Sequence, residues 1–310
     1  MILTLGAFDG FHRGHQKLLE KAASLAEDEA RWAVVTFSPH PQMVLSPSPR
    51  PALFSESERD LIARFLRIPN LIKIDFTRWL AELAPEAFMD FLAKNIDVSG
   101  LVVGDDFRYG QSRKGDVVQL TESCRRRRWR VAVLPQLVLD GQSVSSTLLR
   151  QKIAGGDVVA ASELLGYPFF AVGVVVPGDR RGRTLGFPTA NLSLPQGKIF
   201  PERGVYATAA LVGEEWRPGA LNVGFNPTFE GRRSLRFEVH FPGFNGDLYG
   251  QSLPVFILKR LREEMRFGCP EELAAQMGRD VGKVLEAWER YRPTAQEPLR
   301  RWKSLLSRYV

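Results

Sequence analysis

A hydroxyl and a carboxamide stand two residues apart at Thr189 and Asn191, directly after a segment rich in glycine and proline, residues 182–188. On an extended segment these two side chains point to the same side. Neutral oxygen ligands on one side suit a Mg²⁺ ion that still carries phosphate oxygens and water. The alternative interpretation is a turn followed by an ordinary strand.

A second phosphate-type pattern opens the chain at residues 2–15. An apolar run ends in Gly6, a loop with Gly10 follows, and a helical pattern comes next. A strand, a glycine loop and a helix N-terminus in this order aim backbone N–H groups and the helix dipole at an anion. His12 and His15 share a face of the first helical turn, where imidazoles donate to phosphate oxygens as charge develops during transfer. Either histidine alone is also an ordinary surface residue.

Hydroxyl residues also precede a later helical pattern, at Ser145, Ser146 and Thr147, with Arg150 one turn further on. The hydroxyls, free backbone N–H groups and guanidinium would form another anion cradle. The alternative is simply a well-capped helix.

Strict alternation over residues 235–241 predicts a strand. Its apolar members face the core, and Arg236, Glu238 and His240 share the opposite side. Glu238 belongs either to a polar outer face or to a barrel mouth, where it would act as a general base for phosphoryl transfer.

Two different folds are expected to position these groups. Residues 1–147 alternate strand-like runs with helical patterns, which indicates a doubly wound parallel sheet with ligands at the loops after strand C-termini. From Gly166 onward, short alternating runs between turn clusters indicate a small antiparallel barrel, followed by helical periodicity. We therefore place the domains at residues 1–166 and 167–310. The expected strands are 2–5, 33–37, 71–76, 101–103 and 131–134, then 169–176, 204–211, 219–223, 235–241 and 253–258.

Composition restricts the class of protein. The 310 residues are 44% apolar and 25% charged, and no apolar run approaches the length of a membrane span. Cys124 and Cys269 lack metal spacing, so we expect a reducing compartment, the cytoplasm, and no structural zinc. The net charge of +7 favours anionic partners. The basic run 125–128 is expected to be a solvated helix end, although RNA binding is an alternative. No feature of the sequence indicates an oligomeric state.

Together these motifs resemble the bifunctional bacterial riboflavin kinase/FAD synthetase (FMN adenylyltransferase) family, from about Leu5 to beyond Phe267. The first half is similar to the adenylyltransferase module through G-x-F-D-G-x-H-x-G-H at 6–15, T-F-x-P-H-P at 36–41, G-x-D-F-x-x-G at 104–110 and S-S-T-x-x-R at 145–150. The second half is similar to the kinase module through the highly specific G-R-T-L-G-F-P-T-A-N at 182–191, and through matches at 222–229, 238–240, 246–250 and 261–264.

The resemblance implies a nucleotidyltransferase (Rossmann-like) domain followed by a β-barrel kinase domain with a C-terminal helix. It implies ATP-dependent phosphorylation of riboflavin to FMN in the barrel. In the first domain it implies adenylylation of FMN to FAD with release of pyrophosphate. The substrates are riboflavin, FMN and ATP with Mg²⁺, and neither nucleic acid nor membrane is involved.

The residues that the resemblance implies fall into four groups. The catalytic residues are Glu238, His12, His15 and Arg150, and the metal ligands are Thr189 and Asn191. The ATP and phosphate ligands are Gly6, Phe8, Asp9, Gly10, Gly14, Ser145, Ser146, Thr147, Gly178, Gly182, Arg183 and Gly186. The flavin ligands are Asp106, Phe107 and Arg262.

Other functions stay open at this point. Family members commonly carry a polar residue at the position of Ala7 and commonly extend before that of Met1, so one alternative is a monofunctional kinase with a weak or inactive adenylyltransferase domain. Another is a flavin-binding protein without chemistry, against which the intact His12, His15 and Arg150 argue. A transferase with a different acceptor, such as a cytidylyltransferase, does not account for the barrel.

Overall fold

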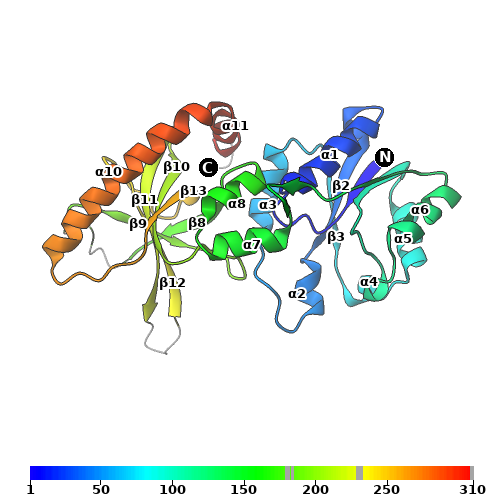
Figure 1. The fold of residues 1–310 in the computed structure, drawn as a ribbon, viewed down its shortest axis with the longest axis horizontal. Coiled ribbons are helices and arrows are strands. Elements are labelled where there is room, and N and C mark those ends of the chain that lie inside the picture. Colours follow the sequence, from blue (N-terminus) through cyan, green and yellow to red (C-terminus); the bar gives the residue numbers. More distant parts are fainter. Residues whose placement is uncertain (179–181, 183–184, 228–232, 308–310) are drawn as a thin grey trace. The chain divides into compact units, whose positions relative to one another are not determined.

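The computed structural model describes residues 1–178, 182, 185–227 and 233–307 (Figure 1). The chain divides into two compact units, Met1–Leu148 and Leu149–Val310. The sequence-based boundary at residue 166 stays a proposal. In the described parts of the chain, no helix has both the length and the apolar character needed to cross a bilayer.

The first unit is built on a five-stranded parallel sheet. Its strands lie in the order β3-β2-β1-β4-β5, and every adjacent pair is parallel. All four residues of the central strand β1 are buried, as expected for a strand covered on both faces. The predicted doubly wound sheet is therefore confirmed. The strands are β1 (Ile2–Leu5), β2 (Trp32–Ser38), β3 (Leu71–Asp75), β4 (Gly100–Gly104) and β5 (Arg130–Leu134).

Helices cover both faces of this sheet, with α1 and α3 on one side and α4 to α6 on the other (Figure 1). A capping box starts α3, because Ser55 Oγ accepts the Glu58 N–H and the Glu58 carboxylate accepts the Ser55 N–H. The helices are α1 (Arg13–Leu25), α2 (Pro41–Leu45), α3 (Glu56–Phe65), α4 (Arg78–Ala81), α5 (Pro85–Asn95) and α6 (Val117–Arg126), with 3-10 turns at Glu29–Arg31 and Gln111–Arg113. A hairpin of β6 (Val138–Leu139) and β7 (Gln142–Ser143) follows.

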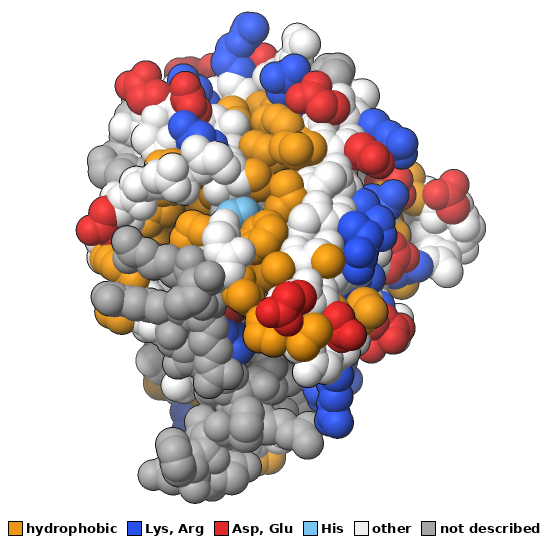
Figure 2. All heavy atoms as spheres, turned by 90° about the vertical axis from the view of Figure 1, so that its left-hand side faces the viewer, with side chains coloured by type: hydrophobic (Ala, Val, Ile, Leu, Met, Phe, Trp, Pro, Cys, Tyr) orange, Lys and Arg blue, Asp and Glu red, His pale blue; other side chains and the backbone are white. Residues whose placement is uncertain are grey.

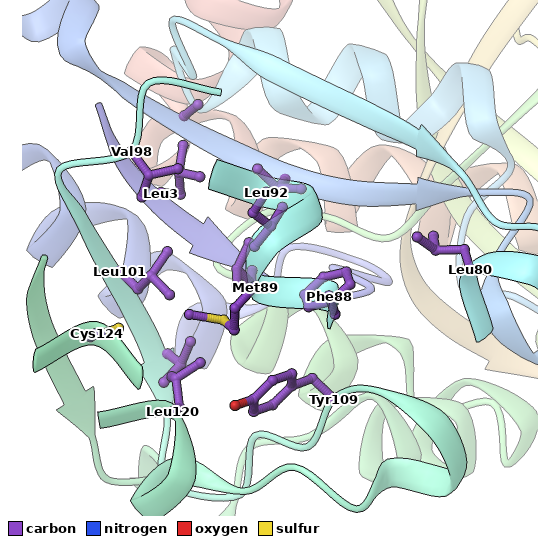
Figure 3. Packing of buried hydrophobic residues seen from close by; sticks show 14 residues of the cluster. Leu3, Leu80, Phe88, Met89, Leu92, Val98, Leu101, Tyr109, Leu120 and Cys124 are labelled. Carbon is purple, nitrogen blue, oxygen red and sulfur yellow. The ribbon is translucent and has the colours of Figure 1, made fainter. Parts of the chain in front are cut away.

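One core fills the space between the sheet and helices α4 to α6. Figure 3 shows Met89 and Leu92 of α5 beside Leu3 of β1 and Leu101 of β4, all almost fully buried. Cys124 belongs to the same cluster and is free and buried. Burial raises the pKa of its thiol to about 11, so this cysteine packs as an apolar group.

The second unit contains a closed six-stranded barrel with the order β10-β11-β12-β9-β8-β13, and all its strand pairs are antiparallel. The predicted antiparallel barrel is thus confirmed. It contains one strand absent from the expected set, β9, which is the extended segment that carries Thr189 and Asn191. The strands are β8 (Phe170–Val176), β9 (Thr189–Ser193), β10 (Gly204–Val212), β11 (Glu215–Pro227), β12 (Arg233–His240) and β13 (Ser252–Arg262).

A long helix covers part of the outer surface of the barrel. All nine residues of β10 are buried, because one face points into the barrel and the other lies under α10. Ala209 packs against Trp288 of this helix and against Leu299 of the helix that follows it. The expected C-terminal helices are therefore present, as α10 (Pro270–Thr294) and α11 (Gln296–Leu306). Helices α7 (Ser146–Ala154) and α8 (Val158–Leu165) precede the barrel.

Candidate active sites

Three neighbouring barrel strands present one row of polar side chains. Glu238 of β12 is the direct partner of Asn191 on β9 and of Asn222 on β11. Directly paired residues point to the same face of a sheet. A second row two residues away pairs His240 with Thr189, and it lies on this same face. The register alone therefore brings together the carboxylate, the hydroxyl and the carboxamide singled out from the sequence.

Glu238 and His240 are almost fully buried, at 9% and 6% exposure, and one polar atom of each lies beside a partner. The Arg236 Nε lies 2.7 Å from Glu238 Oε1. His240 Nδ1 is 2.8 Å from the Pro188 carbonyl oxygen, and its ring meets that of Phe187 edge-on. The polar side of β12 is thus turned into a structured site and is not a solvent-exposed face.

Glu238 and Asn222 of the first row and His240 and Thr189 of the second line a cavity of about 310 Å³, which the segment after β13 and α10 also border. Asn191 is not part of this lining. Its apolar wall includes Met265, Phe267 and Met277. Figure 2 shows apolar side chains gathered along a furrow with a histidine at its floor. An apolar wall with a few convergent polar groups is the usual form of a small-molecule site.

Arg262 lines this cavity, but its guanidinium is already engaged by Asp280 of α10. Its Nε donates to Oδ1 and Oδ2 (3.1 and 3.0 Å) and its Nη2 donates to Oδ2 (2.7 Å). Gln276 Nε2 donates to the same carboxylate at 2.8 Å. The Arg262–Asp280 pair therefore fixes α10 to the end of β13 beside the cavity. The sequence interpretation missed Asp280 and Gln276, whose only signal was their i, i+4 spacing.

Two of the predicted glycines have a steric reason in this unit. A Cβ at Gly178 would lie 2.2 Å from Asn191 Nδ2, and one at Gly182 would lie 2.3 Å from the Phe187 carbonyl oxygen. Gly186 has a positive φ of 82°, which favours glycine. Arg183 lies outside the described residues.

In the first unit, the loop after β1 places two imidazoles against each other. The His12 and His15 rings stack with centroids 3.6 Å apart. His12 caps α1, since its Nδ1 accepts the His15 backbone N–H at 3.3 Å. The ring proton of neutral His12 therefore lies on Nε2. His15 Nδ1 is buried and has no hydrogen-bond partner among the residues the structure describes.

Both imidazoles are neutral at pH 7. Burial lowers the pKa of His12 from 6.5 to about 4, against a smaller opposing effect of a backbone hydrogen bond. Burial also lowers the pKa of His15 well below 6.5, and the positive charge on a protonated His12 adds to this. The pair therefore offers neutral N–H donors, without the charge of an imidazolium.

The same loop holds two phenylalanines in a backbone conformation that is uncommon for residues other than glycine. Phe8 and Phe11 have positive φ angles of 45° and 39°, and Gly10 has 90°. Such strain persists only where the surroundings fix it. A Cβ at Gly6 would lie 3.2 Å from the Phe8 ring, and one at Gly14 would lie 3.2 Å from the His12 ring.

Asp9 ties this loop to two other segments. Both oxygens of its buried carboxylate accept the Leu53 N–H, at 3.0 and 3.1 Å. Its backbone carbonyl accepts a hydrogen bond from Ser146 Oγ at 3.0 Å. Arg59, which the sequence interpretation missed, donates to the Ala7 carbonyl at 3.3 Å and is buried. These contacts hold the loop in place, and the side chain of Ala7 takes no part in them.

The remaining predicted residues of this site lie on two further elements. Ser145 Oγ accepts the Leu148 N–H at 3.2 Å. Thr147 and Arg150 lie on α7, which brings the hydroxyls to one helix start and the guanidinium to its second turn. Asp106 is exposed, and Phe107 stacks on Tyr109 with centroids 5.8 Å apart. Their loop follows β4, beside the loop after β1, at the point where the strand order reverses.

Comparisons with known proteins identify the family to which the chain belongs. Residues 1–148 match the family model for FAD synthetase and residues 165–288 match that for riboflavin kinase. The bifunctional riboflavin kinase/FMN adenylyltransferase of Bacillus subtilis is 34% identical over 296 residues, which cover 94% of this chain and 93% of that protein. The protein of the same name from Escherichia coli K12 is 37% identical, with 90% of each chain covered. The chain belongs to the bifunctional riboflavin kinase/FMN adenylyltransferase family.

A solved structure supports the same overall fold. A protein from Streptococcus pneumoniae, named as a macrolide-efflux protein, superposes with a TM-score of 0.84 at 32% identity, covering 91% of this chain and 93% of that one. Its likeness extends over both units of this chain.

Proposed function

We propose that this chain makes FAD from riboflavin in two steps. The barrel unit transfers the γ-phosphoryl group of ATP to riboflavin, and the first unit transfers the adenylyl group of a second ATP to FMN. The observation that carries the proposal is the row formed by Glu238 and Asn191 on paired strands, with Thr189 in the adjacent row. It brings the Thr189 and Asn191 side chains of the family's kinase motif next to the carboxylate of Glu238.

In the kinase step, the terminal ribityl hydroxyl attacks the γ-phosphorus of ATP. The bond from the γ-phosphorus to the bridging oxygen breaks, ADP leaves, and the hydroxyl proton passes to the Glu238 carboxylate. Arg236 engages one carboxylate oxygen at 2.7 Å, so the other is left to accept that proton. The apolar wall of the cavity suits a flat ring system, with its polar chain directed to the row of polar groups.

Mg²⁺ is implied by the family, and the residues present fit it. Thr189 and Asn191 supply neutral oxygen donors, and the missing Cβ of Gly178 makes the space that the Asn191 carboxamide occupies. When bound, the ion neutralises charge on the transferring phosphate. Thr189 and Asn191 would hold it beside the carboxylate of Glu238.

In the adenylyltransferase step, an FMN phosphate oxygen attacks the α-phosphorus of ATP and pyrophosphate leaves. Neutral His12 donates through Nε2–H to oxygens whose negative charge grows during transfer. The strained loop after β1 and the start of α7 direct backbone N–H groups to the other phosphates. No protein nucleophile is required, because attack and departure are in line.

One assay tests the whole proposal. The purified chain is incubated with riboflavin, ATP and Mg²⁺, and the flavins are separated by chromatography. FMN followed by FAD is the expected result. FMN alone would favour the monofunctional kinase, and riboflavin unchanged would contradict both activities.

A further inference from the structure

A second cavity in the barrel unit is separate from the proposed kinase pocket. It has a volume of about 490 Å³ and lies between β13 and α10, with Val159 of α8 at its edge. Two cations of β13, Lys259 and Arg260, contribute to its wall. Arg260 is held in place by Glu202, with Nη1 3.0 Å from Oε2. A space of this size matches a small-molecule site.

The opposite wall is a single face of α10. Lys283, Glu286, Ala287, Arg290 and Tyr291 line the cavity, at positions i, i+3, i+4, i+7 and i+8 of the helix. This spacing places them side by side along one stripe. The cavity therefore holds four cations from two elements against one carboxylate.

Most of this positive charge has no ion-pair partner in the part of the chain that the structure describes. Lys259, Lys283 and Arg290 form no ion pair with any residue that the structure describes. Glu286 stands three and four residues from Lys283 and Arg290, where helical pairs usually form, yet it is paired with neither. Convergent unpaired cations in a concave site attract an anion of high charge.

The cavity also has an apolar side, which narrows the class of ligand. Leu258, Leu261 and the half-buried ring of Tyr291 belong to the same lining. An aromatic surface beside a cluster of cations suits a planar base attached to phosphates. We propose that this second cavity, called the groove from here on, is a nucleotide-binding site. It is distinct from the two sites of the proposed reactions.

The same two elements continue into the kinase pocket. Arg262 follows Leu261 on β13, and Asp280 lies one turn before Lys283 on α10. Arg262 and Asp280 both line the kinase pocket. A nucleotide that joins β13 to α10 in the groove therefore also acts on the Arg262–Asp280 pair. This coupling rests on the proposed kinase function, whereas the groove itself does not. Because coupling is reciprocal, riboflavin in the kinase pocket then changes nucleotide affinity in the groove.

Lysine footprinting locates the site directly. The full chain is acetylated with and without ATP, FMN or FAD, and modification at Lys259 and Lys283 is measured by mass spectrometry, with Lys94 of α5 as the internal reference. At least one nucleotide is expected to slow acetylation of the two groove lysines several-fold and to leave Lys94 unchanged. Riboflavin, which has no phosphate, is expected to give no protection. Unchanged rates with all three nucleotides would overturn the proposal.

Paired variants separate this site from the reaction sites. Arg290→Glu is expected to raise the nucleotide concentration for half-protection about tenfold, as loss of a charge-assisted contact implies. Arg300→Glu makes the same charge change on α11, outside both cavities, and should leave the nucleotide concentration for half-protection unchanged. The assignment would be overturned if Arg290→Glu and the wild type needed the same nucleotide concentration for half-protection. It would also be overturned if pyrophosphate alone protected the two lysines as well as the nucleotide does. The footprint needs no turnover, so failure of the flavin assay leaves this result interpretable.

Discussion

Glu238 and Asn191 are direct partners across β12 and β9, so their Cβ atoms are separated by about 4.5–5.5 Å, the ordinary spacing of cross-strand pairs. The distance between the proposed base and the proposed metal ligand is thus set by a backbone ladder. A one-residue slip of β12 would turn Glu238 into the barrel interior. The register of two short strands is therefore the structural basis of the proposed kinase step.

Replacement of the proposed base gives the first prediction. Glu238→Gln keeps the shape of the side chain but removes its ability to take the hydroxyl proton. FMN formation should fall between about 10²- and 10⁴-fold, while FAD formation from supplied FMN stays near the wild-type rate. Both rates are measured by separating the flavins over time.

The reverse variant is the control for this experiment. His12→Ala should impair FAD formation and leave FMN formation intact. If either substitution removed both activities in a chain that remains folded by circular dichroism, the model of two separate sites would be wrong.

A second prediction concerns the space around Asn191. A Cβ at Gly178 would come within 2.2 Å of the carboxamide nitrogen, so Gly178→Ala must displace the side chain proposed to hold Mg²⁺. The Mg²⁺ concentration for half-maximal FMN formation should rise several-fold, with FAD formation unaffected. Gly282→Ala in α10, where a Cβ meets no atom within 4 Å, is the matched control. An unchanged Mg²⁺ dependence in Gly178→Ala would argue against this metal site.

Periodicity and turn chemistry were enough to predict both folds, because each unit repeats one pattern several times. The parallel sheet, the barrel and the C-terminal helices all follow from apolar spacing. The strand β9 was not among the expected strands, since it is only five residues long and directly follows a segment rich in glycine and proline. Pairs such as Arg262 with Asp280 join residues far apart in sequence, and no local pattern reports them.

The motif residues of the first unit could also be predicted from local spacing, but the contacts that each of them makes could not. The glycine and histidine spacing marks the loop after β1, which the parallel sheet then places at its carboxyl edge. The sequence did not indicate that the Asp9 carboxylate turns away to hold Leu53, because this contact depends on a segment 44 residues further along the chain. The anchoring by Arg59 was hidden in the same way.

The lowered pKa values of the two stacked histidines predict a stability that depends on pH. An unfolded histidine takes up a proton near pH 6.5, whereas folded His12 does so only near pH 4. Between these values the unfolded state binds more protons, so stability is lost as the pH falls from about 6.5 towards 4. His12 alone should reduce the free energy of unfolding of the first unit by about 2 kcal/mol between pH 7 and 5.

His12→Asn tests this expectation, because asparagine can still cap α1 but does not titrate. Unfolding by urea at pH 7, 6 and 5 should show a smaller loss in the variant than in the wild type. NMR of the imidazole protons should place the midpoint of His12 near pH 4. A midpoint near 6.5 would contradict the buried, neutral state on which the proposed adenylyl transfer depends.

The basic run 125–128 gives the last prediction, because its four arginines are not equivalent. Arg125 is mostly exposed and, among the residues that the structure describes, pairs only with Glu122 in its own helix turn. Arg127 is largely buried, joins α6 to α5 through Glu86 and Asp90, and lies 5.8 Å from the centre of the Trp129 ring. One residue of the run, Arg127, therefore has a structural role, because it links the end of α6 to α5.

Substitution within this run separates a structural role from a binding role. Arg127→Ala should destabilise the first unit by about 1–2 kcal/mol, since two carboxylates lose a shared partner, and should lower its melting temperature by a few degrees. Arg125→Ala, with the same change of charge, should leave the melting temperature unchanged. Thermal unfolding followed by circular dichroism measures both. Equal melting temperatures for the two variants, together with an equal and salt-dependent loss of RNA affinity, would instead support the RNA-binding alternative.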